Sequence, residues 1–356
     1  MNIAILSLRS RYGDVTGDCV QAEKTAEALR RIGENAERYY LDPQSGKIYG
    51  KMNEELGVWL GVMADKDIIH TIPPIPFANI LRQPKVKAKL VASSVFWSSP
   101  TYWKVVLKNS IRVDFALLRA LIRELAVKFG VKLLRAKDGY DLLLPNSEDE
   151  IRCVKKYCRL KKGAKLIAVP NAIDPIPEWV ENLARPKEVP DEEYLLVPGV
   201  FAPRKNQMSL IKALDGFPRP IVFIGAGSLL ERCQKKASSN MIFLGHIEHG
   251  SQLFYSLMKH ARVVCLPSNC ETPGIAGLEA AALGARPVVP YEGGTAQYFS
   301  WDAEYLDPLS STSIRVAVQK AWERGRLSRY EQGRYRYMTW DRCAQMTVEA
   351  YRKVTI

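Results

Sequence analysis

The stretch 262-RVVCLPSNCETPGIAGLEAAALGARPVVPYEGGTAQYF-299 predicts the fold of the chain around it. Its apolar run from Val263 to Leu266 ends at a proline, which is typical of a buried strand. A helix of small residues is expected to start at Thr272 and Pro273, because threonine can cap an amide and proline suits the first helical position. Gly284 is expected to end this helix, and a second apolar strand follows. The pattern predicts strand, loop, helix and strand in succession.

Two carboxylates flank the predicted helix start: Glu271 in the loop before it and Glu279 within it. A helix N-terminus offers free amides and a positive dipole end to a phosphate. Gly274, Ala276 and Gly277 are expected to leave room for a ligand near the backbone. Carboxylates beside such a site would accept hydrogen bonds from hydroxyl groups. A sugar attached to a diphosphate therefore suits both the helix start and the carboxylates. The alternative is an ordinary helix packed on a sheet with two surface glutamates, and the Glu-x7-Glu spacing alone favours that alternative.

Length and composition indicate a soluble globular protein. A chain of 356 residues is long enough for two domains. Hydrophobic residues make up 47% and charged residues 25% of the chain, the proportions of an ordinary globular protein. The longest apolar runs are shorter than a membrane span, so no transmembrane helix is expected. The first residues predict a strand rather than a secretory signal.

The seven cysteines are scattered and contain no Cys-x-x-Cys pair. This pattern predicts a reducing compartment and a cytoplasmic location, and it argues against a structural zinc site. The net charge of +13 would suit nucleic acid, an anionic membrane surface or phosphorylated ligands. Because the chain shows no helix-turn-helix, zinc-finger or aromatic RNA-binding signature, no nucleic-acid partner is expected.

Apolar strands alternate with helices along both halves of the chain. Strands are predicted at 2–8, 38–41, 67–70, 89–96, 141–144, 165–169, 194–197, 221–224 and 241–244, before the opening stretch. Helices are predicted at 20–32, after the cap Ser147, and at 207–214. A proline-rich, acidic segment at 176–191 predicts a linker. The chain is therefore expected to be an α/β protein with two Rossmann-like, doubly wound parallel-sheet domains, 1–175 and 192–335, that face a cleft.

Two features of the first half limit its chemistry. No G-x-G-x-x-G follows the first strand, so the dinucleotide-binding fingerprint is absent. His70 stands alone at the end of a predicted strand, where a histidine is more often structural than catalytic.

The segment 102–123 predicts a basic amphipathic helix. Five cations fall within a sector of about 100° on a helical wheel, opposite an apolar face; they are Lys104, Lys108, Arg112, Arg119 and Arg123. Such a helix can lie on an anionic membrane surface. The same pattern also describes the solvated face of a core helix, and the sequence leaves both interpretations open.

With these pieces in order, the chain resembles the retaining glycosyltransferases of family GT4, which have the GT-B fold. The resemblance rests first on Glu271-x7-Glu279, followed at family spacing by Gly284, Pro287-Val288-Val289 and Gly293-Gly294. Supporting motifs are Gly17, the Pro-Asn-Ala-Ile-Asp run at 170–174 and Lys205-Asn206. The tail, placed at 336–356, is similar to the last helix of the family, which crosses back to the first domain.

The resemblance implies a metal-independent enzyme of the hexosyltransferase type (EC 2.4) that needs no cofactor. It would move a sugar from a nucleotide-diphosphate sugar to an acceptor with retention of anomeric configuration. Glu271 and Lys205 would be the catalytic residues, and Glu279 would hold the ribose hydroxyls. The residues implied in donor binding are Gly17, Arg204, Lys205, Gly225, Gly245, Ile247, Glu271, Pro273, Gly274, Ile275 and Glu279. Lys205 also makes sense on physical grounds, because a departing diphosphate builds negative charge that a cation stabilises.

The chain departs from the family pattern at several positions. Val200 stands where the family has an arginine, and Val95-Phe96-Trp97 stands where it often has a histidine. These departures motivate an alternative, a nucleotide-sugar-binding or regulatory protein with impaired catalysis on the same fold. An epimerase of this fold class ranks below both. The basic helix suggests a lipid-linked or phosphorylated glycan as acceptor and peripheral contact with an anionic membrane.

Overall fold

The computed structural model describes residues 1–8, 17–42, 47–50, 55–72, 86–94, 139–157 and 160–355. The predicted basic helix at 102–123 lies outside these residues. Contacts divide the chain into two compact units. The described residues up to Ser94, those from Gly139 to Ala172 and the tail from Thr339 form the first unit, and Ile173–Met338 belong to the second.

The first unit is built on a mixed sheet in the order β4-β3-β2-β1-β5-β6-β7-β8. Its strands are β1 (Asn2–Leu8), β2 (Asn35–Leu41), β3 (Lys47–Tyr49), β4 (Glu55–Val58), β5 (Ile68–Thr71), β6 (Lys89–Ser94), β7 (Leu142–Pro145) and β8 (Lys165–Leu166). The central pairings are parallel, as predicted, whereas β3 and β4 form an antiparallel edge that the sequence analysis did not foresee.

Helices cover both faces of this sheet, as the strand periodicity requires. They are α1 (Gly17–Arg31), α2 (Trp59–Met63), α5 (Glu148–Tyr157) and α13 (Trp340–Thr355). Ile3 and Ile5 of β1 pack in one cluster with α1 and α13, while Ala4 and Leu6 pack in another with Met63. The amide of Glu150 donates to the Ser147 hydroxyl at 3.0 Å, which confirms the predicted cap of α5.

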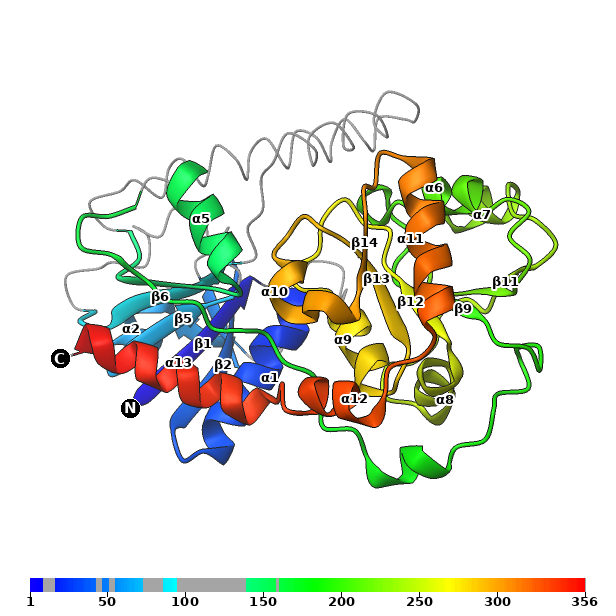
Figure 1. The fold of residues 1–356 in the computed structure, drawn as a ribbon. Helices are drawn as coiled ribbons and strands as arrows, with labels where there is room; N and C mark the ends of the chain where they lie inside the picture. The colour runs from blue at the N-terminus through cyan, green and yellow to red at the C-terminus, as the bar shows by residue number, and fades with distance from the viewer. Residues whose placement is uncertain are drawn as a thin grey trace. The chain divides into compact units, whose positions relative to one another are not determined.

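The C-terminal helix α13 belongs to the first unit, as predicted. It packs along α1 (Figure 1), and the two are tied by an ion pair of 2.7 Å between Arg31 and Asp341. His70 on β5 is fully buried, with Nδ1 2.6 Å from the hydroxyl of Tyr351 and Nε2 2.9 Å from Ser93 Oγ. His70 is therefore a structural link between the sheet and the tail helix.

The second unit contains a parallel sheet in the order β11-β10-β9-β12-β13-β14. The strands are β9 (Leu195–Pro198), β10 (Ile221–Ile224), β11 (Met241–Phe243), β12 (Val263–Cys265), β13 (Arg286–Pro290) and β14 (Glu304–Leu306). The α-helices are α6 (Gln207–Ala213), α7 (Leu230–Gln234), α8 (Gln252–His260), α9 (Ile275–Ala282), α10 (Thr295–Phe299), α11 (Ser311–Arg324) and α12 (Arg329–Arg336). Short 3-10 helices are η2 (Glu178–Asn182), η3 (Pro203–Lys205) and η4 (Ser300–Asp302).

Alternate residues of β9 face opposite layers of helices. Leu195 and Val197 pack with α6 and α11, whereas Leu196 packs with α8 and α9. Figure 1 shows α6 and α11 on one side of this sheet and α8 and α9 on the other. The segment 176–191 is packed onto this unit, since it contributes Val180 and Val189 to the second cluster. None of the helices in the described ranges combines the length and apolar character that crossing a bilayer requires.

Candidate functional site

The strand order of the second unit determines where a ligand can bind. β9 comes first in sequence, β10 and β11 extend the sheet on one side of it, and β12 begins the other side. The connections after β9 and β12 therefore leave the sheet in opposite directions. In open parallel sheets, ligands bind at this switch point, beyond the carboxyl ends of the two central strands.

The loops that follow these two strands bring together the two predicted catalytic residues. Lys205 ends η3 after β9, and Glu271 lies in the loop after β12. Lys205 Nζ is 2.6 Å from Glu271 Oε1, and the two side chains are only 18% and 8% exposed. The hydroxyl of Ser268 donates to the same carboxylate oxygen. Charge-assisted hydrogen bonds are stronger when shielded from water in this way, so the carboxylate is held in one orientation.

The start of α9 corrects one expectation. The helix begins at Ile275, and Gly274 with φ +89° is the residue before it, so Thr272 and Pro273 are neither cap nor first turn. Because the left-handed conformation of Gly274 cannot be part of a right-handed helix, the helix cannot begin any earlier. The first amides of α9 then have no partner four residues back in the helix, as at any helix N-terminus.

Side chains of the protein pack against two of the small residues. A Cβ on Gly277 would lie 3.1 Å from Leu266 and 3.2 Å from Phe299, and a Cβ on Gly274 would lie 2.8 Å from Leu266. The space in which a side chain at these positions would stand is therefore filled by the protein itself. Gly277 is a packing residue, because it lets α9 approach the sheet closely.

The Gly293-Gly294 turn after β13 supports the loop of Glu271. Gly293 has φ +103°, and a Cβ on it would lie 1.9 Å from the carbonyl oxygen of Glu271. The amide of Glu271 donates to the Glu292 carbonyl at 3.2 Å. The two backbones are therefore in direct contact, and only glycine fits at position 293.

The second carboxylate of the motif, Glu279, is buried on α9 and contacts a residue that sequence reasoning missed. His249 Nε2 lies 2.6 Å from Glu279 Oε1, and the two side chains are 51% and 5% exposed. His249 stands in the loop between β11 and α8, and nothing in its local sequence indicates this contact. The exposed imidazole covers the carboxylate that the resemblance assigns to ribose hydroxyls.

The remaining predicted donor-binding residues are dispersed. Gly225 and Gly245 follow neighbouring strands, and the amide of Gly225 donates to the Gly245 carbonyl at 2.6 Å. Ile247 is half-buried against the α8 side of the core. Arg204 is exposed next to Lys205, and its carbonyl accepts from the Asn269 amide at 3.0 Å. Gly17 begins α1 in the first unit.

Pro273 lies between Glu271 and Gly274 in the loop before α9, so the ion pair brings Lys205 to the loop that contains Glu271, Pro273 and Gly274. Within the described part of the chain, no three His, Cys, Asp or Glu side chains are grouped as a metal site requires.

Comparison with known proteins finds a family model that matches the part of the chain containing this site. Residues 180–306 match the family model described as glycosyl transferases group 1. The chain is 25% identical over 270 residues to O-antigen chain mannosyltransferase C of Escherichia coli, an alignment that covers 72% of this chain and 66% of that protein. The chain thus spans slightly less than two thirds of that relative.

Solved structures share the fold over nearly the whole chain. Sucrose-phosphate synthase from Thermosynechococcus elongatus superposes with a TM-score of 0.69 at 16% identity, covering 99% of this chain and 98% of that one. HepE from Anabaena, solved in complex with UDP-glucose, superposes with a TM-score of 0.61 at 14% identity, covering 99% and 98%. Residues 180–306 therefore match the glycosyl transferases group 1, and the chain has the GT-B fold.

Proposed function

We propose that the protein is a glycosyltransferase that moves a sugar from a nucleotide-diphosphate sugar to an acceptor, with retention of anomeric configuration and without a metal ion. The observation that carries the proposal is the Lys205–Glu271 pair of 2.6 Å beyond the carboxyl ends of β9 and β12. The family match over the same unit and the names of the relatives, which are themselves glycosyltransferases, support it.

The residues of the site divide the chemistry between them. Breaking the bond between sugar and diphosphate leaves negative charge on the departing phosphate. The Lys205 ammonium and the first amides of α9 would stabilise this charge without a metal. Glu271, oriented by Lys205 and Ser268, would accept a hydrogen bond from a hydroxyl group of the transferred sugar. A cation and a hydroxyl acceptor side by side are what a sugar phosphate requires.

The nucleoside end of the donor would be recognised by Glu279. Its carboxylate would accept hydrogen bonds from the ribose hydroxyl groups. His249 would then have to share the carboxylate with the ribose, or move away from it, when the donor binds. HepE was solved with UDP-glucose, and we infer a nucleotide-sugar of the same general kind here, with base and sugar to be identified by binding.

The acceptor follows from the sequence rather than from the described residues. The basic segment 102–123 leads us to propose a lipid-linked or phosphorylated glycan, met at an anionic membrane surface.

A donor panel tests the proposal directly. Thermal shifts with UDP, GDP, ADP and their sugars should single out one nucleotide, because a ligand that binds the folded state stabilises it by mass action. The selected donor should then be hydrolysed slowly, and Glu271→Ala should abolish the hydrolysis while the exposed control Glu231→Ala retains it. Activity should persist in EDTA, and NMR of the released sugar should show the donor's anomeric configuration first.

Two results would contradict the proposal. Full activity of Glu271→Ala would show that the site is wrongly assigned. Tight nucleotide binding without turnover on any acceptor would favour the binding or regulatory protein that Val200 suggested.

A further inference from the structure

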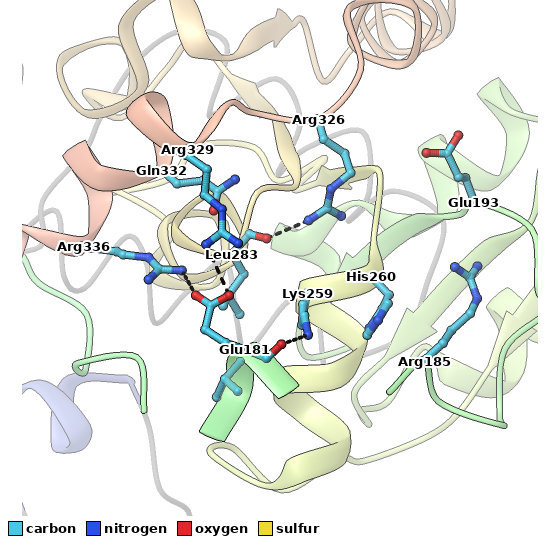
Figure 2. Close-up of a pocket in the computed structure, with 11 residues that line it drawn as sticks. Glu181, Arg185, Glu193, Lys259, His260, Leu283, Arg326, Arg329, Gln332 and Arg336 are labelled. Carbon is cyan, nitrogen blue, oxygen red and sulfur yellow. Dashed lines mark hydrogen bonds and ion pairs between the residues drawn. The ribbon is translucent and has the colours of Figure 1, made fainter. Parts of the chain in front are cut away.

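The second unit contains a basic pocket near the amino-terminal ends of its strands, whereas Lys205 and Glu271 lie beyond the carboxyl ends. The pocket has a volume of about 400 Å³ and is shown in Figure 2. Its lining comes from the segment before β9, from the ends of α8 and α9, and from α12 and the residues just before it. We call this cavity the basic pocket; its lining cations are Arg185, Lys259, Arg326, Arg329 and Arg336. β9 has four residues, so its amino-terminal and carboxyl ends are separated by roughly 13 Å.

Several of these cations are held by carbonyl groups rather than by carboxylates. Arg326 donates to the carbonyls of Ala261 and Leu283, at the ends of α8 and α9. Lys259 Nζ donates to the carbonyls of Glu181 and Leu183 at 2.6 and 3.0 Å. Such bonds orient the cations next to the negative ends of the helices. They do not neutralise the cations, because a carbonyl group has no formal charge.

Carboxylates in the pocket are too few to balance the cations. Glu181 is shared by Arg336 at 2.7 Å and Arg329 at 3.3 Å, as Figure 2 shows. The other lining carboxylate, Glu193, pairs at 2.6 Å with Arg262, which is not part of the lining. Five cations therefore face two carboxylates, one of which is engaged elsewhere. Capping of helix ends explains Arg326, but it does not explain Arg329, whose side chain is 81% exposed.

The pKa of His260 is affected by the charges around this pocket. Burial lowers its pKa, and the neighbouring charges of Lys259, Arg185 and Arg326 lower it further, against the hydrogen bond to the Ser256 carbonyl, which raises it. Burial is the largest cause of this shift, and the neighbouring charges that add to it are all positive.

Gly284, next to the lining residue Leu283, leaves room for two of these side chains. A Cβ on Gly284, whose φ is +99°, would lie 2.7 Å from Arg326 Nη2 and 2.9 Å from Gln332 Nε2. Glycine at this position lets both nitrogens cross the end of α9. The side chains drawn in Figure 2 converge from different segments on one cavity.

We propose that the basic pocket binds a phosphate group, carried either by a soluble phosphomonoester or by a lipid headgroup. Planar guanidinium groups match phosphate oxygens in pairs, and a cavity of this volume has room for the group to which the phosphate is attached. The site is separate from the proposed donor site and does not depend on it. A second anion site on the donor-binding unit would let a phosphorylated compound act on the enzyme without competing for the donor.

Calorimetry with inorganic phosphate and glycerol 3-phosphate, in phosphate-free buffer at constant ionic strength, tests the soluble source. Arg329→Gln removes an exposed cation and should weaken binding about tenfold, the typical effect of losing one charge-assisted hydrogen bond. Arg232→Gln, which removes an exposed arginine from α7 outside the pocket, is the matched control and should bind normally. Lys205→Gln should also bind phosphate normally if the phosphate occupies the basic pocket. If the phosphate occupied the donor site instead, this variant would lose the binding.

Vesicles test the membrane source. Phosphatidic acid in phosphatidylcholine should retain the wild type more strongly than Arg329→Gln, whereas phosphatidylserine vesicles of equal charge should retain both alike. NMR supplies a readout inside the pocket: bound glycerol 3-phosphate should raise the pKa of His260, identified by the loss of its signal in His260→Gln.

Binding that depends on Arg329 in either arm supports the site and identifies its source. The absence of binding in both arms would overturn the proposal. So would binding that Lys205→Gln abolishes and Arg329→Gln leaves intact, or a His260 pKa that stays unchanged while glycerol 3-phosphate binds.

Discussion

Lys205 and Glu271 are 66 residues apart in the chain, yet their side chains meet at 2.6 Å. Each stands in a loop that follows one of the two central strands of the second sheet, so the pair joins the loops across the switch point. Both side chains are largely buried. The ion pair therefore orients the loops before any ligand arrives, and this preorganisation is what a site for a developing charge requires.

Breaking this pair should separate its structural role from its chemical one. Lys205→Met leaves the buried Glu271 carboxylate without its ammonium partner, and we expect a loss of about 2 kcal/mol in the free energy of unfolding. If Lys205 stabilises the leaving phosphate as proposed, turnover should fall about 100-fold or more. Urea unfolding and donor hydrolysis measure the two effects.

The double variant Lys205→Met/Glu271→Leu provides the control for that experiment. Removing both charges should recover much of the stability, since no buried charge is left alone, while activity stays low. If the double variant is as unstable as the sum of the single variants, the two residues do not form an energetically coupled pair.

Gly293→Ala should damage the site through the backbone. The added methyl group would meet the Glu271 carbonyl, in addition to the strain of φ +103°. Gly250→Ala is the matched control, because Gly250 has φ +80° and a Cβ on it would have no neighbouring atom within 4 Å. The control should cost about 1 kcal/mol of stability from the left-handed backbone alone. Gly293→Ala should cost clearly more and should also weaken nucleotide binding in calorimetry; equal losses in the two variants would exclude the contact as the cause.

His70 should make the first unit sensitive to acid. Burial lowers the pKa of His70 from 6.5 to about 3. The unfolded chain therefore takes up a proton below about pH 6.5 that the folded chain refuses. Stability is complete above pH 6.5 and falls as the pH drops towards 3, by at most about 1.4 kcal/mol per pH unit from this residue.

Denaturant unfolding between pH 4.5 and 7.5 checks this dependence. His70→Gln should be less stable at neutral pH, because its bonds to Ser93 and Tyr351 are disturbed. Its free energy of unfolding should nevertheless change less steeply with pH than that of the wild type. Parallel curves for the two proteins would assign the acid sensitivity to other groups.

The basic segment 102–123 predicts binding to anionic membranes. Vesicles containing phosphatidylserine should sediment the protein, and reversing the charge of Lys108, Arg112 and Arg119 to glutamate should release it. Higher salt should have the same effect, because screening weakens surface attraction. Sedimentation that survives charge reversal would mean that the cations form only a solvated face.

Local patterns in the sequence predicted much of the architecture. Buried parallel strands are continuous apolar runs, so β1, β10 and β12 could be located directly. Glycine was also informative where a helix ends, and Gly284 with φ +99° follows α9 as expected. The short strands β3, β4 and β14 were missed because each contains a charged residue, Lys47, Glu55 or Glu304, and so none is a continuous apolar run.

The sequence by itself determined the order of the apolar strands and of the main helices, and the positions of the two glutamates, because periodicity and turn residues act over a few neighbouring positions. Only the tertiary structure decided what those glutamates touch. The contacts of Glu271 with Lys205 and of Glu279 with His249 depend on which strands are neighbours in the sheet. The start of α9 and the filling of the space beside Gly277 were decided in the same way, by side chains and backbone that pack from distant parts of the chain.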